Sequence, residues 1–476
     1  MMKAVQDRRA LVAIDLGAES CRVSLLRWIG DKPEIQMLHR VSNGPVQVGD
    51  HLHWPLERIL AGVEEGLRKA AAAAPEGIRS IAVDGWAVDY VRLGVDGAPV
   101  GRPFCYRDER NVAAKDAVEM LVPADEHFAQ SGAQPLRINT VYQLKADERA
   151  GVDAAVPWLL LPEYLLHWLG GRPVAEYTNA THTGLVDLET RDWSKELFAR
   201  LGLAIEAAPP IVAAGSCVGR VTGELSKLPA FADTCLIAPA CHDTASAIAA
   251  ITADLAHTAY IVSGTWSLVG TVVERPIGSA EALRAGFTNQ GAAAGGYCFH
   301  TNVNGMWMLK QCMDSWCAEG RAIDLPTLIA QAARVTAIPG LIDVDAAPLM
   351  LAGEMPSRIN HELASRGFAT IEDAPGNEPV FARVIFASLA KRYASVLEHL
   401  GELTGRRFQS ITILGGGSRN SLLSRLTEES TELPVFAGEA EGSTLGNFAV
   451  QLAAGEAGGP PSPALVRAWA GRLSGR

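Results

Sequence analysis

The same strand–turn–strand pattern occurs twice in this chain of 476 residues, about half a chain apart. In the first copy, residues 11–26, two β-rich runs flank a turn of small and polar residues at 15–20. In the second copy, residues 259–273, the corresponding turn lies at 263–267. Apolar runs joined by such turns predict β-hairpins. Two similar hairpins indicate a duplication, with two related α/β domains that face each other.

The boundary between the two domains is expected near residue 250. A short β-rich run at 236–238 leads into an Ala-rich segment, 244–250, that predicts a helix. A chain of this length suits two or three domains. We therefore expect an N-terminal domain over 1–250, a C-terminal domain over 251–455, and a loosely held tail over 456–476, which holds two consecutive prolines and a basic end.

The clearest amphipathic helix is predicted over 381–400, where apolar side chains share one stripe. A β-rich run at 411–414 follows it and leads directly into three glycines at 415–417. A second helix is predicted over 59–74.

Charge and cysteine use restrict the class of protein. The net charge of −11 argues against a nucleic-acid binder, although a local positive pocket could still take an anionic substrate. The first nine residues carry no apolar run, and no apolar stretch is long enough to span a bilayer. The eight cysteines form no C-x-x-C pair, which fits reduced thiols. We expect a cytoplasmic protein that binds neither membrane nor nucleic acid.

Asp243 lies between small residues, where the predicted strand at 236–238 gives way to the predicted helix. A carboxylate at a helix N-terminus is kept ionised by the helix dipole and by free backbone N–H groups. That placement suits a general base that accepts a proton from an alcohol. The alternative is that Asp243 only caps the helix.

Three small-residue turns could cradle phosphate groups, at 17–20, 263–265 and 415–420. Glycine and alanine let the backbone approach a ligand and direct several N–H groups at it, although ordinary hairpin turns use the same residues. The chain contains no P-loop, and no G-x-G-x-x-G follows the first strand. Asp15 follows an apolar run beside the first turn. Next to phosphates it would require a cation such as Mg²⁺, and the alternative is a turn-forming aspartate.

These segments resemble, in the same order, the motifs of a known family. Segments 12–20, 263–267 and 414–417 are similar to the two phosphate motifs and the adenosine motif of the actin and hexokinase superfamily, and within it the chain resembles the FGGY carbohydrate kinases. The narrower markers, which cover nearly the whole chain, are 83–90, 106–108, 142–144, 176–181, 242–246, 263–268, 305–307 and 441–447. The resemblance implies an α/β fold with two ribonuclease-H-like (actin/hexokinase-type) domains and an interdomain cleft.

The resemblance also implies an activity, its cofactors and its partners. The expected reaction is ATP- and Mg²⁺-dependent phosphorylation of a ketose at O1, with L-rhamnulose as the expected ketose. A kinase for another deoxy-ketose, such as L-fuculose, is the nearest alternative, and a non-catalytic sugar or nucleotide sensor is a more remote one. The expected partners are therefore a small ketose and ATP, bound by a monomer or a small homo-oligomer.

The resemblance assigns a role to each candidate residue. Asp243 would be the catalytic base and Asp15 the metal ligand. The expected sugar contacts are Trp86, Ala87, His242, Thr244 and Asn302. The expected ATP contacts are Gly17, Ala18, Glu19, Ser20, Cys21, Arg22, Thr265, Lys310 and Gly416.

Three of these positions depart from the family pattern, which favours Gly at 87 and 21 and Gln at 310. The methyl group of Ala87 could alter which ketose fits, Cys21 restricts the turn, and Lys310 adds a positive charge near the nucleotide.

Overall fold

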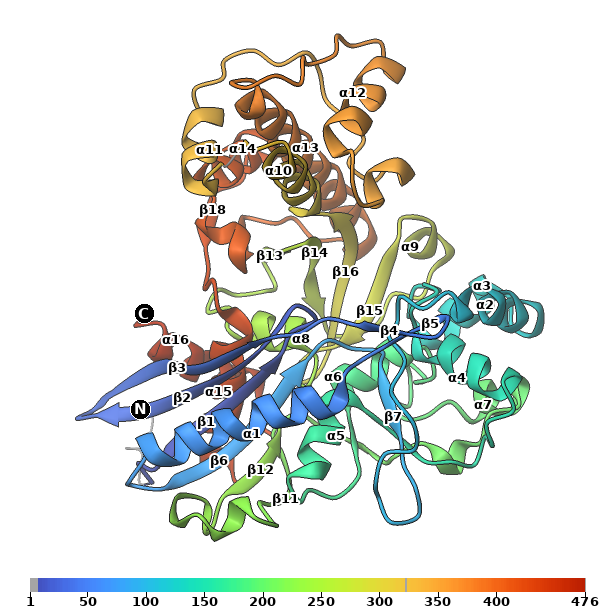
Figure 1. The fold of residues 1–476 in the computed structure, drawn as a ribbon, viewed down its shortest axis with the longest axis vertical. Helices are drawn as coiled ribbons and strands as arrows, with labels where there is room; N and C mark the ends of the chain where they lie inside the picture. The colour runs from blue at the N-terminus through green and yellow to red at the C-terminus, as the bar shows by residue number, and fades with distance from the viewer. Residues whose placement is uncertain (1–6, 322, 476) are drawn as a thin grey trace.

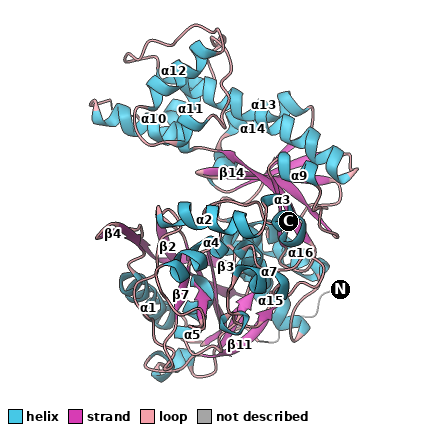
Figure 2. Ribbon diagram, turned by 90° about the vertical axis from the view of Figure 1, so that its right-hand side faces the viewer, coloured by secondary structure: helices cyan, strands magenta, loops and turns pink. Residues whose placement is uncertain are grey.

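Two lobes make up this computed structural model, which describes residues 7–321 and 323–475 (Figure 1). Each lobe contains a six-stranded mixed β-sheet (Figure 2). In the N-terminal lobe the strand order is β11-β12-β6-β1-β2-β3. These strands are β1 (Ala10–Leu16), β2 (Ser20–Ile29), β3 (Lys32–Ser42), β6 (Ile78–Gly85), β11 (Ser216–Arg220) and β12 (Cys235–Ala238).

The sheet of the C-terminal lobe has the order β15-β16-β14-β13-β17-β18. Its strands are β13 (Thr258–Ser263), β14 (Trp266–Val273), β15 (Phe287–Gly291), β16 (Tyr297–Asn304), β17 (Ser410–Leu414) and β18 (Val435–Ala437). Both predicted hairpins are present, as the antiparallel pairs β1–β2 and β13–β14.

Five strands of each sheet follow the same plan. The hairpin β1–β2 continues antiparallel to β3, while β1 pairs parallel with β6 and β6 with β12. In the second sheet β13–β14 continues antiparallel to β16, while β13 pairs parallel with β17 and β17 with β18. This repeated order confirms the predicted fold class, an α/β protein with two ribonuclease-H-like domains.

The two long predicted helices are present and slightly longer than expected. Helix α1 (Leu56–Ala73) buries Ile59, Val63 and Leu67 against the first sheet, in the core that also holds Val12 and Ile14. These positions share one face of a helix because its period is about 3.6 residues. Helix α13 (Glu378–Thr404) ends at Gly405, whose φ of 64° is the left-handed conformation that a helix C-terminus favours.

The remaining elements are insertions into this plan. Between β6 and β11 lie β7 (Tyr90–Arg92), α2 (Arg110–Leu121), α3 (Ala124–Ser131), α4 (Thr140–Arg149), β8 (Trp158–Leu160), α5 (Leu161–Trp168), β9 (Ala175–Glu176), α6 (Tyr177–Ala180), the 3₁₀ turn η1 (Thr181–Thr183), α7 (Lys195–Leu201) and β10 (Ile211–Val212). The C-terminal lobe adds α9 (Ala280–Arg284), α10 (Trp307–Ala318), α11 (Leu325–Ala332), α12 (Met355–Ser365) and α14 (Ser421–Thr431). A short hairpin, β4 (Val46–Val48) and β5 (His51–His53), precedes α1.

Two helices cross where the lobes meet, α8 (Asp243–Ala249) and α15 (Gly442–Ala457). A Cβ atom on Gly446 would lie 1.7 Å from the backbone oxygen of Ser246, so the crossing requires glycine there. Helix α15 follows the last strand of the second sheet, yet it packs against β1 and β6 of the first. Each sheet is therefore followed by a helix at the junction between the lobes.

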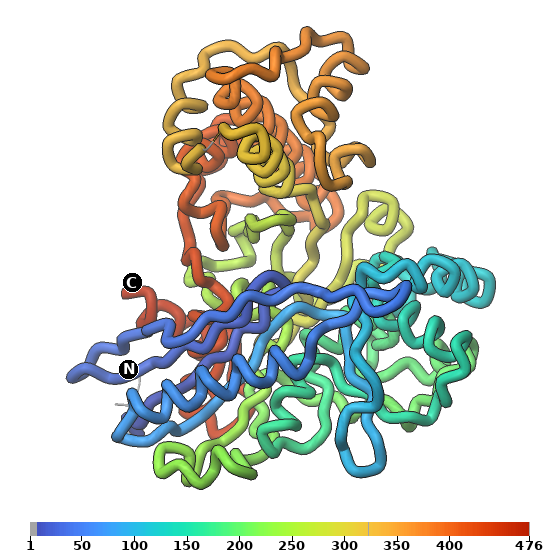
Figure 3. Tube along the Cα trace, viewed as in Figure 1, coloured from blue at the N-terminus to red at the C-terminus, as the bar shows by residue number. Residues whose placement is uncertain are grey.

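The C-terminal segment differs from the expected loose tail. Residues Pro463–Leu473 form helix α16, and the indole of Trp469 is only 2% exposed. It contacts Trp28 of β2 edge-on, with ring centroids 6.3 Å apart. In Figure 3 the chain accordingly returns to the N-terminal lobe at its end. Helix α15 ends before the two prolines, at the left-handed Gly458, and a further amphipathic helix begins beyond them.

The largest hydrophobic core crosses from the inserted helices into the C-terminal lobe. It holds Phe128 and Tyr177 of the insertion together with Phe287 and Phe299 of the second sheet. Strand β15 makes the polar part of this contact, since Asn289 N donates to Gly132 O. The lobes are therefore joined along β15 as well as at the α8–α15 crossing.

Cys217 of β11 and Cys235 of the neighbouring strand β12 form a disulfide, with Cα atoms 6.6 Å apart. The expectation that all cysteines are reduced is wrong for this pair, because sheet pairing brings together two residues 18 positions apart. No helix in the described ranges has both the length and the apolar character needed to cross a membrane.

Candidate active site

Two aspartates end neighbouring strands of the first sheet. Asp15 of β1 and Asp84 of β6 are in register on parallel strands, so their side chains share one face of the sheet. The alternation of β1 places Leu11 and Ala13 on that same face, in the core beside α15. Asp15 is thus a strand residue at the carboxyl end of β1, and its reading as a turn-forming aspartate is wrong.

Helix α15 presents a polar stripe to these aspartates. Ser443 Oγ donates to Asp15 Oδ2 at 2.7 Å, and Asn447 Nδ2 donates to Asp84 Oδ2 at 2.6 Å. One turn further, Gln451 Nε2 donates to the backbone oxygen of Val12. We predicted no role for these three side chains from the sequence. Their spacing of four residues in an otherwise apolar helix is the signal that could have revealed a buried polar stripe.

The carboxylates of this site carry more negative charge than the positively charged side chains beside them balance. Burial, together with the charge of neighbouring Asp243, raises the pKa of Asp15 to about 6. Burial and the charge of Asp15 raise the pKa of Asp84 as well. Arg22 opposes this effect, with Nη1 3.1 Å from Asp15 Oδ2 and 3.0 Å from Glu441 Oε2. A further cation would therefore be favoured beside Asp15.

Asp243 is the first residue of α8, and His242 is the N-cap, so the alternative in which Asp243 is the cap is wrong. Thr244 Oγ1 donates to Asp243 Oδ1 at 3.2 Å, and His242 Nε2 lies 3.4 Å from the same oxygen. The side chain is 34% exposed, which leaves it open to a ligand. Burial of the surrounding site raises the pKa of Asp243 to about 6. A carboxylate that is ionised at neutral pH yet basic enough to take a proton is suited to general base catalysis.

A line of hydrogen bonds leads from His242 into the C-terminal lobe. His242 Nδ1 lies 3.0 Å from His182 Nε2, and His182 Nδ1 lies 3.1 Å from Gln290 Nε2. Burial lowers the pKa of His242 to about 3 and the pKa of His182 well below its usual value, so both rings are neutral. His182 belongs to η1 and Gln290 to β15, and neither is among the candidate residues of the sequence analysis.

Two buried glutamates hold the loop that precedes Asp243. Glu176 Oε2 accepts from Cys241 N at 2.8 Å, and Glu176 Oε1 accepts from Thr178 N at 3.0 Å. Glu163 Oε1 in turn accepts from Glu176 N at 3.0 Å. Burial raises the pKa of Glu176 to about 8 and that of Glu163 to about 7. The carboxyl group of Glu176 fixes the backbone two residues before Asp243.

The first small-residue turn joins β1 to β2 and is shaped by its glycine. Gly17 N donates to Ser20 O at 3.1 Å, and a Cβ on Gly17 would lie 2.6 Å from that oxygen. Glu19 is exposed and Ala18 is half-buried. The side chain of Cys21 points into the core, where burial raises its pKa to about 12. Cys21 can therefore meet a nucleotide only through its backbone.

The other two turns lie together at the ends of β13 and β17. A Cβ on Gly417 would lie 2.1 Å from Ser263 Oγ, which shows how closely the glycines approach the second turn. The amides of Met306 and Trp307, at the start of α10, donate to the oxygens of Gly264 and Thr265. Thr265 and Gly416 therefore lie in one region, and their contact with a nucleotide stays a prediction.

The expected sugar contacts have different surroundings. The indole of Trp86 is buried against Trp54, with ring centroids 4.3 Å apart, and Nε1 donates to Asp89 Oδ2. This favours a packing role for the ring. Ala87 is also buried. Asn302 of β16 is exposed, two residues beyond the buried His300 and on the same face of the sheet.

Lys310 is exposed on α10 and pairs with Asp314 one helical turn away, with Nζ 2.7 Å from Oδ2. Its charge is already partly neutralised, so the structure gives no sign that it is reserved for a phosphate.

Comparisons with known proteins agree with this arrangement. Residues 10–250 match the N-terminal domain, and residues 259–455 the C-terminal domain, of the FGGY family of carbohydrate kinases. The chain belongs to this family. A rhamnulokinase from Bacteroides thetaiotaomicron is 34% identical to this FGGY kinase. The match covers 94% of the present chain and 91% of the rhamnulokinase.

Solved structures of other sugar kinases share the fold. A ligand-bound xylulose kinase from Lactobacillus acidophilus has a TM-score of 0.77 at 16% identity and covers 98% of this chain and 96% of its own. A glycerol kinase from Plasmodium falciparum with ADP has a TM-score of 0.74 at 14% identity and covers 97% and 92%. At such low identity these likenesses show the fold alone. Membership of the family makes this chain a carbohydrate kinase, a phosphotransferase.

The residues around Asp15 fit the Mg²⁺ expected for such an enzyme. Mg²⁺ prefers oxygen ligands and is usually bound through one or two carboxylates, with waters and substrate phosphates. Oδ1 of Asp84 is buried with no hydrogen-bond partner among the described residues. Over residues 7–321 and 323–475, no cluster of three or more His, Cys, Asp or Glu side chains could hold a metal alone. Asp15 as a metal ligand stays a prediction.

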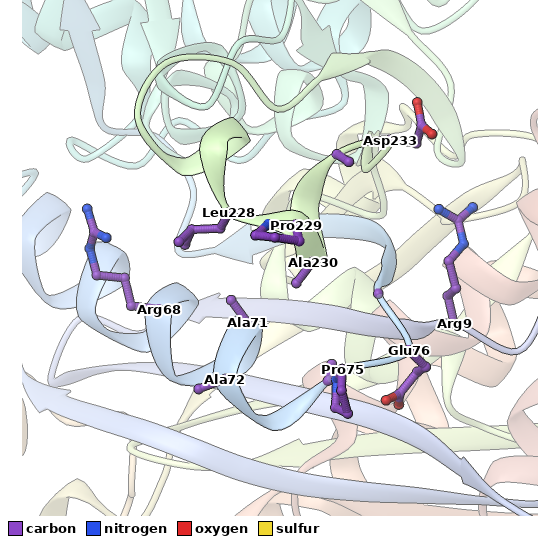
Figure 4. Close-up of a pocket in the computed structure, with 13 residues that line it drawn as sticks. Arg9, Arg68, Ala71, Ala72, Pro75, Glu76, Leu228, Pro229, Ala230 and Asp233 are labelled. Atoms are coloured by element: carbon purple, nitrogen blue, oxygen red, sulfur yellow. The ribbon is translucent and has the colours of Figure 1, made fainter.

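A separate surface pocket of about 550 Å³ lies at the opposite ends of the same strands (Figure 4). Arg9 and Gly77 precede β1 and β6 there, and Arg68 of α1 lines the far wall. Ligands of open α/β sheets bind at the carboxyl ends of the strands, so we assign the candidate site to the end that carries Asp15 and Asp84.

Proposed function

We propose that this FGGY kinase transfers the γ-phosphoryl group of ATP to O1 of L-rhamnulose, giving L-rhamnulose 1-phosphate in L-rhamnose catabolism. The observation that carries the proposal is the 34% identity to a rhamnulokinase along 94% of the chain. The placement of Asp243 at the start of α8, partly exposed and with a pKa of about 6, supports an alcohol as acceptor. A cytoplasmic location, expected from the sequence, stays part of the proposal.

In this proposal Asp243 is the catalytic base. An alcohol is far less acidic than a carboxylic acid, so Asp243 orients the O1 hydroxyl and accepts its proton late, as the bond to phosphorus forms. Both side-chain contacts of the carboxylate fall on Oδ1, which leaves Oδ2 to face the sugar. Alignment of the two substrates provides much of the rate enhancement.

The remaining candidates would bind and orient the substrates. Asp15 would hold Mg²⁺, which supplies positive charge to the phosphates as negative charge develops on the leaving group. The sugar would be held by the backbone around Trp86 and Ala87, by His242 and Thr244, and by Asn302 of the other lobe. The nucleotide would lie along the turn that comprises Gly17, Ala18, Glu19, Ser20, Cys21 and Arg22, and beside Thr265 and Gly416, with Lys310 nearby.

The test is ADP release from ATP on addition of single ketoses, with kcat/KM compared across a panel that includes L-rhamnulose, L-fuculose and L-ribulose. We expect L-rhamnulose to give the highest value. A higher value for another ketose would replace the proposed substrate. No ADP release with any sugar would favour a sensor.

The role of Asp243 has its own test. We expect Asp243→Asn to lower kcat by roughly 10²–10⁴-fold, the usual contribution of a general base, while the thermal unfolding midpoint changes little. Near-normal kcat in this folded variant would remove Asp243 from the role.

A further inference from the structure

The charge of Asp243 favours one direction for the hydrogen bonds around His242. His242 Nε2 lies 3.4 Å from Asp243 Oδ1, and a negatively charged oxygen at this distance favours the tautomer with the ring proton on Nε2 over the one with a lone pair there. A neutral imidazole has one N–H, which leaves His242 Nδ1 as an acceptor. His182 Nε2, at 3.0 Å, is therefore the donor to it.

The protonation of His182 also determines which group of Gln290 faces it in the C-terminal lobe. Since the proton of His182 is on Nε2, its Nδ1 accepts, and Gln290 must present its amide nitrogen, which lies at 3.1 Å. In the opposite order the unprotonated Nε2 of His242 would lie 3.4 Å from the negatively charged Oδ1 of Asp243. The series of hydrogen-bond donors thus starts at Gln290 on β15 and ends beside the carboxylate of Asp243.

We propose that His182 and Gln290 are positioning residues for phosphoryl transfer, which lock His242 in the tautomer with hydrogen on Nε2. This proposal rests on the proposed role of Asp243. Thr244 Oγ1 donates to Oδ1 and the protonated Nε2 of His242 lies 3.4 Å from the same oxygen, so the carboxylate is held with Oδ2 toward the acceptor hydroxyl. Because Gln290 belongs to the C-terminal lobe and His242 to the N-terminal lobe, the orientation of the base depends on the contact between the lobes.

His182 and Gln290 are otherwise fixed at this contact. Gly291 N, next to Gln290, donates to Oγ1 of Thr181, next to His182, at 2.8 Å. The two adjacent hydrogen bonds hold η1 against β15. If His182 served only in packing, neither of its ring nitrogens would need a hydrogen-bond partner. Both nitrogens have one, His242 Nδ1 and Gln290 Nε2.

The direct test measures the tautomer in the full chain without substrates. Nitrogen NMR of protein labelled with ¹⁵N in its histidine rings distinguishes protonated from unprotonated ring nitrogens, and His242→Gln and His182→Gln assign the signals. We expect His242 and His182 to be protonated at Nε2 only. A proton on Nδ1 of His242 would overturn the proposal, whatever sugar the enzyme prefers.

The kinetic test compares two matched substitutions, made with whichever ketose is turned over. Gln290→Leu removes the first donor of the chain, and we expect kcat to fall about ten-fold, the effect of one orienting hydrogen bond, with KM for ATP unchanged. Gln134→Leu is the control, because Gln134 also bonds β15 across the lobes, with Nε2 2.8 Å from Phe287 O, but does not touch the histidines.

We expect the two variants to lose similar thermal stability, while only Gln290→Leu loses kcat and gives His242 a mixture of tautomers. Equal kcat in both variants, with His242 unchanged, would overturn the positioning role. If Gln290→Leu does not fold, the tautomers of His242 and His182 measured in the unsubstituted protein still test the proposal.

Discussion

Asp243 combines two opposing influences at the scale of a single residue. Its place at the start of α8 favours the ionised form, through the helix dipole and the hydrogen bond from Thr244. Burial disfavours that form and raises the pKa to about 6. The result is a group that is ionised at neutral pH but a stronger base than an exposed aspartate.

This pKa predicts how activity changes with pH. Above about pH 6 Asp243 is ionised and can accept a proton, whereas below it the carboxyl group is protonated and cannot. We expect kcat/KM for the ketose to be constant at higher pH and to fall about ten-fold per pH unit once the pH is well below 6, if one group controls it. His242, Arg22, Asp15 and Asp84 are the titratable or charged neighbours, and Arg22 lowers the pKa.

The measurement is kcat/KM from pH 4.5 to 8.5, with the thermal unfolding midpoint followed over the same range to exclude acid unfolding. Asp243→Asn is the control, since its residual activity should lack this inflection. An equal inflection in that variant would assign the titration to another group.

The sequence indicated the candidate residues that lie in local motifs and missed those supplied by distant segments. Asp243 and the three turns could be found because strand, small-residue turn and helix follow one another along the chain. His182 lies 60 residues from His242, and Gln290 lies 108 from His182, so only folding brings them together. A single buried glutamine or histidine leaves no local pattern from which its partner could be inferred.

At the scale of elements, α8 and α15 decide how closely the lobes approach. Ser246 and Gly446 meet at the crossing, where the backbones are too close for any side chain on Gly446. Asp243 is one turn before Ser246 on α8, and Ser443, which bonds Asp15, is one turn before Gly446 on α15. The crossing therefore fixes both carboxylates relative to each other.

Gly446→Ala tests this crossing. The added methyl group would lie 1.7 Å from Ser246 O, so the helices must separate. We expect the free energy of unfolding to fall by about 1–3 kcal/mol, as for other overpacked cores, and kcat to fall because Asp243 moves with α8. Urea denaturation and steady-state kinetics measure the two effects.

Gly455→Ala on the same helix is the matched control. Its Cβ would meet only the end of the flexible Arg79 side chain, at 2.0 Å, and Ala favours a helix by up to about 1 kcal/mol over Gly. We expect unchanged kcat and equal or higher stability. A similar loss in both variants would mean that the backbone contact at Gly446 has no special role.

The elements themselves were partly predictable. Both hairpins and α13 follow from periodic apolar patterns, which are local. Helix α16 was missed because its stability depends on Trp469 reaching Trp28, at the other end of the chain.

At the scale of the whole molecule, the lobes are joined on one side by a continuous core. Strand β15 holds the inserted helices through Asn289 and Gly291, and the core around Phe287 and Tyr177 continues beneath it. Among the described residues, no hydrophobic cluster holds residues from both the turn at Gly17 and the turn at Gly416. The duplication predicted this pairing of lobes, but β15 and its contacts lie outside the repeated five-stranded plan.

This asymmetry predicts a rotation about the β15 contact when substrates bind. Water competes with the sugar hydroxyl for the phosphoryl group, so a sugar kinase benefits from closing over both substrates. We propose that the division near residue 250 allows this movement, with α8 and β15 as the fixed side. We expect the radius of gyration from small-angle X-ray scattering to fall when the ketose and a non-hydrolysable ATP analogue are both present.

Asp243→Asn separates closure from chemistry, because it keeps the shape of the side chain and should close to the same extent while turnover is lost. Trp266 offers a second signal, since its side chain is 47% exposed in the second turn, and we expect closure to change its fluorescence. Trp266→Phe should remove that change and leave the scattering result as it is. A radius of gyration unchanged by both ligands would contradict closure and would require water to be excluded by local loop movements instead.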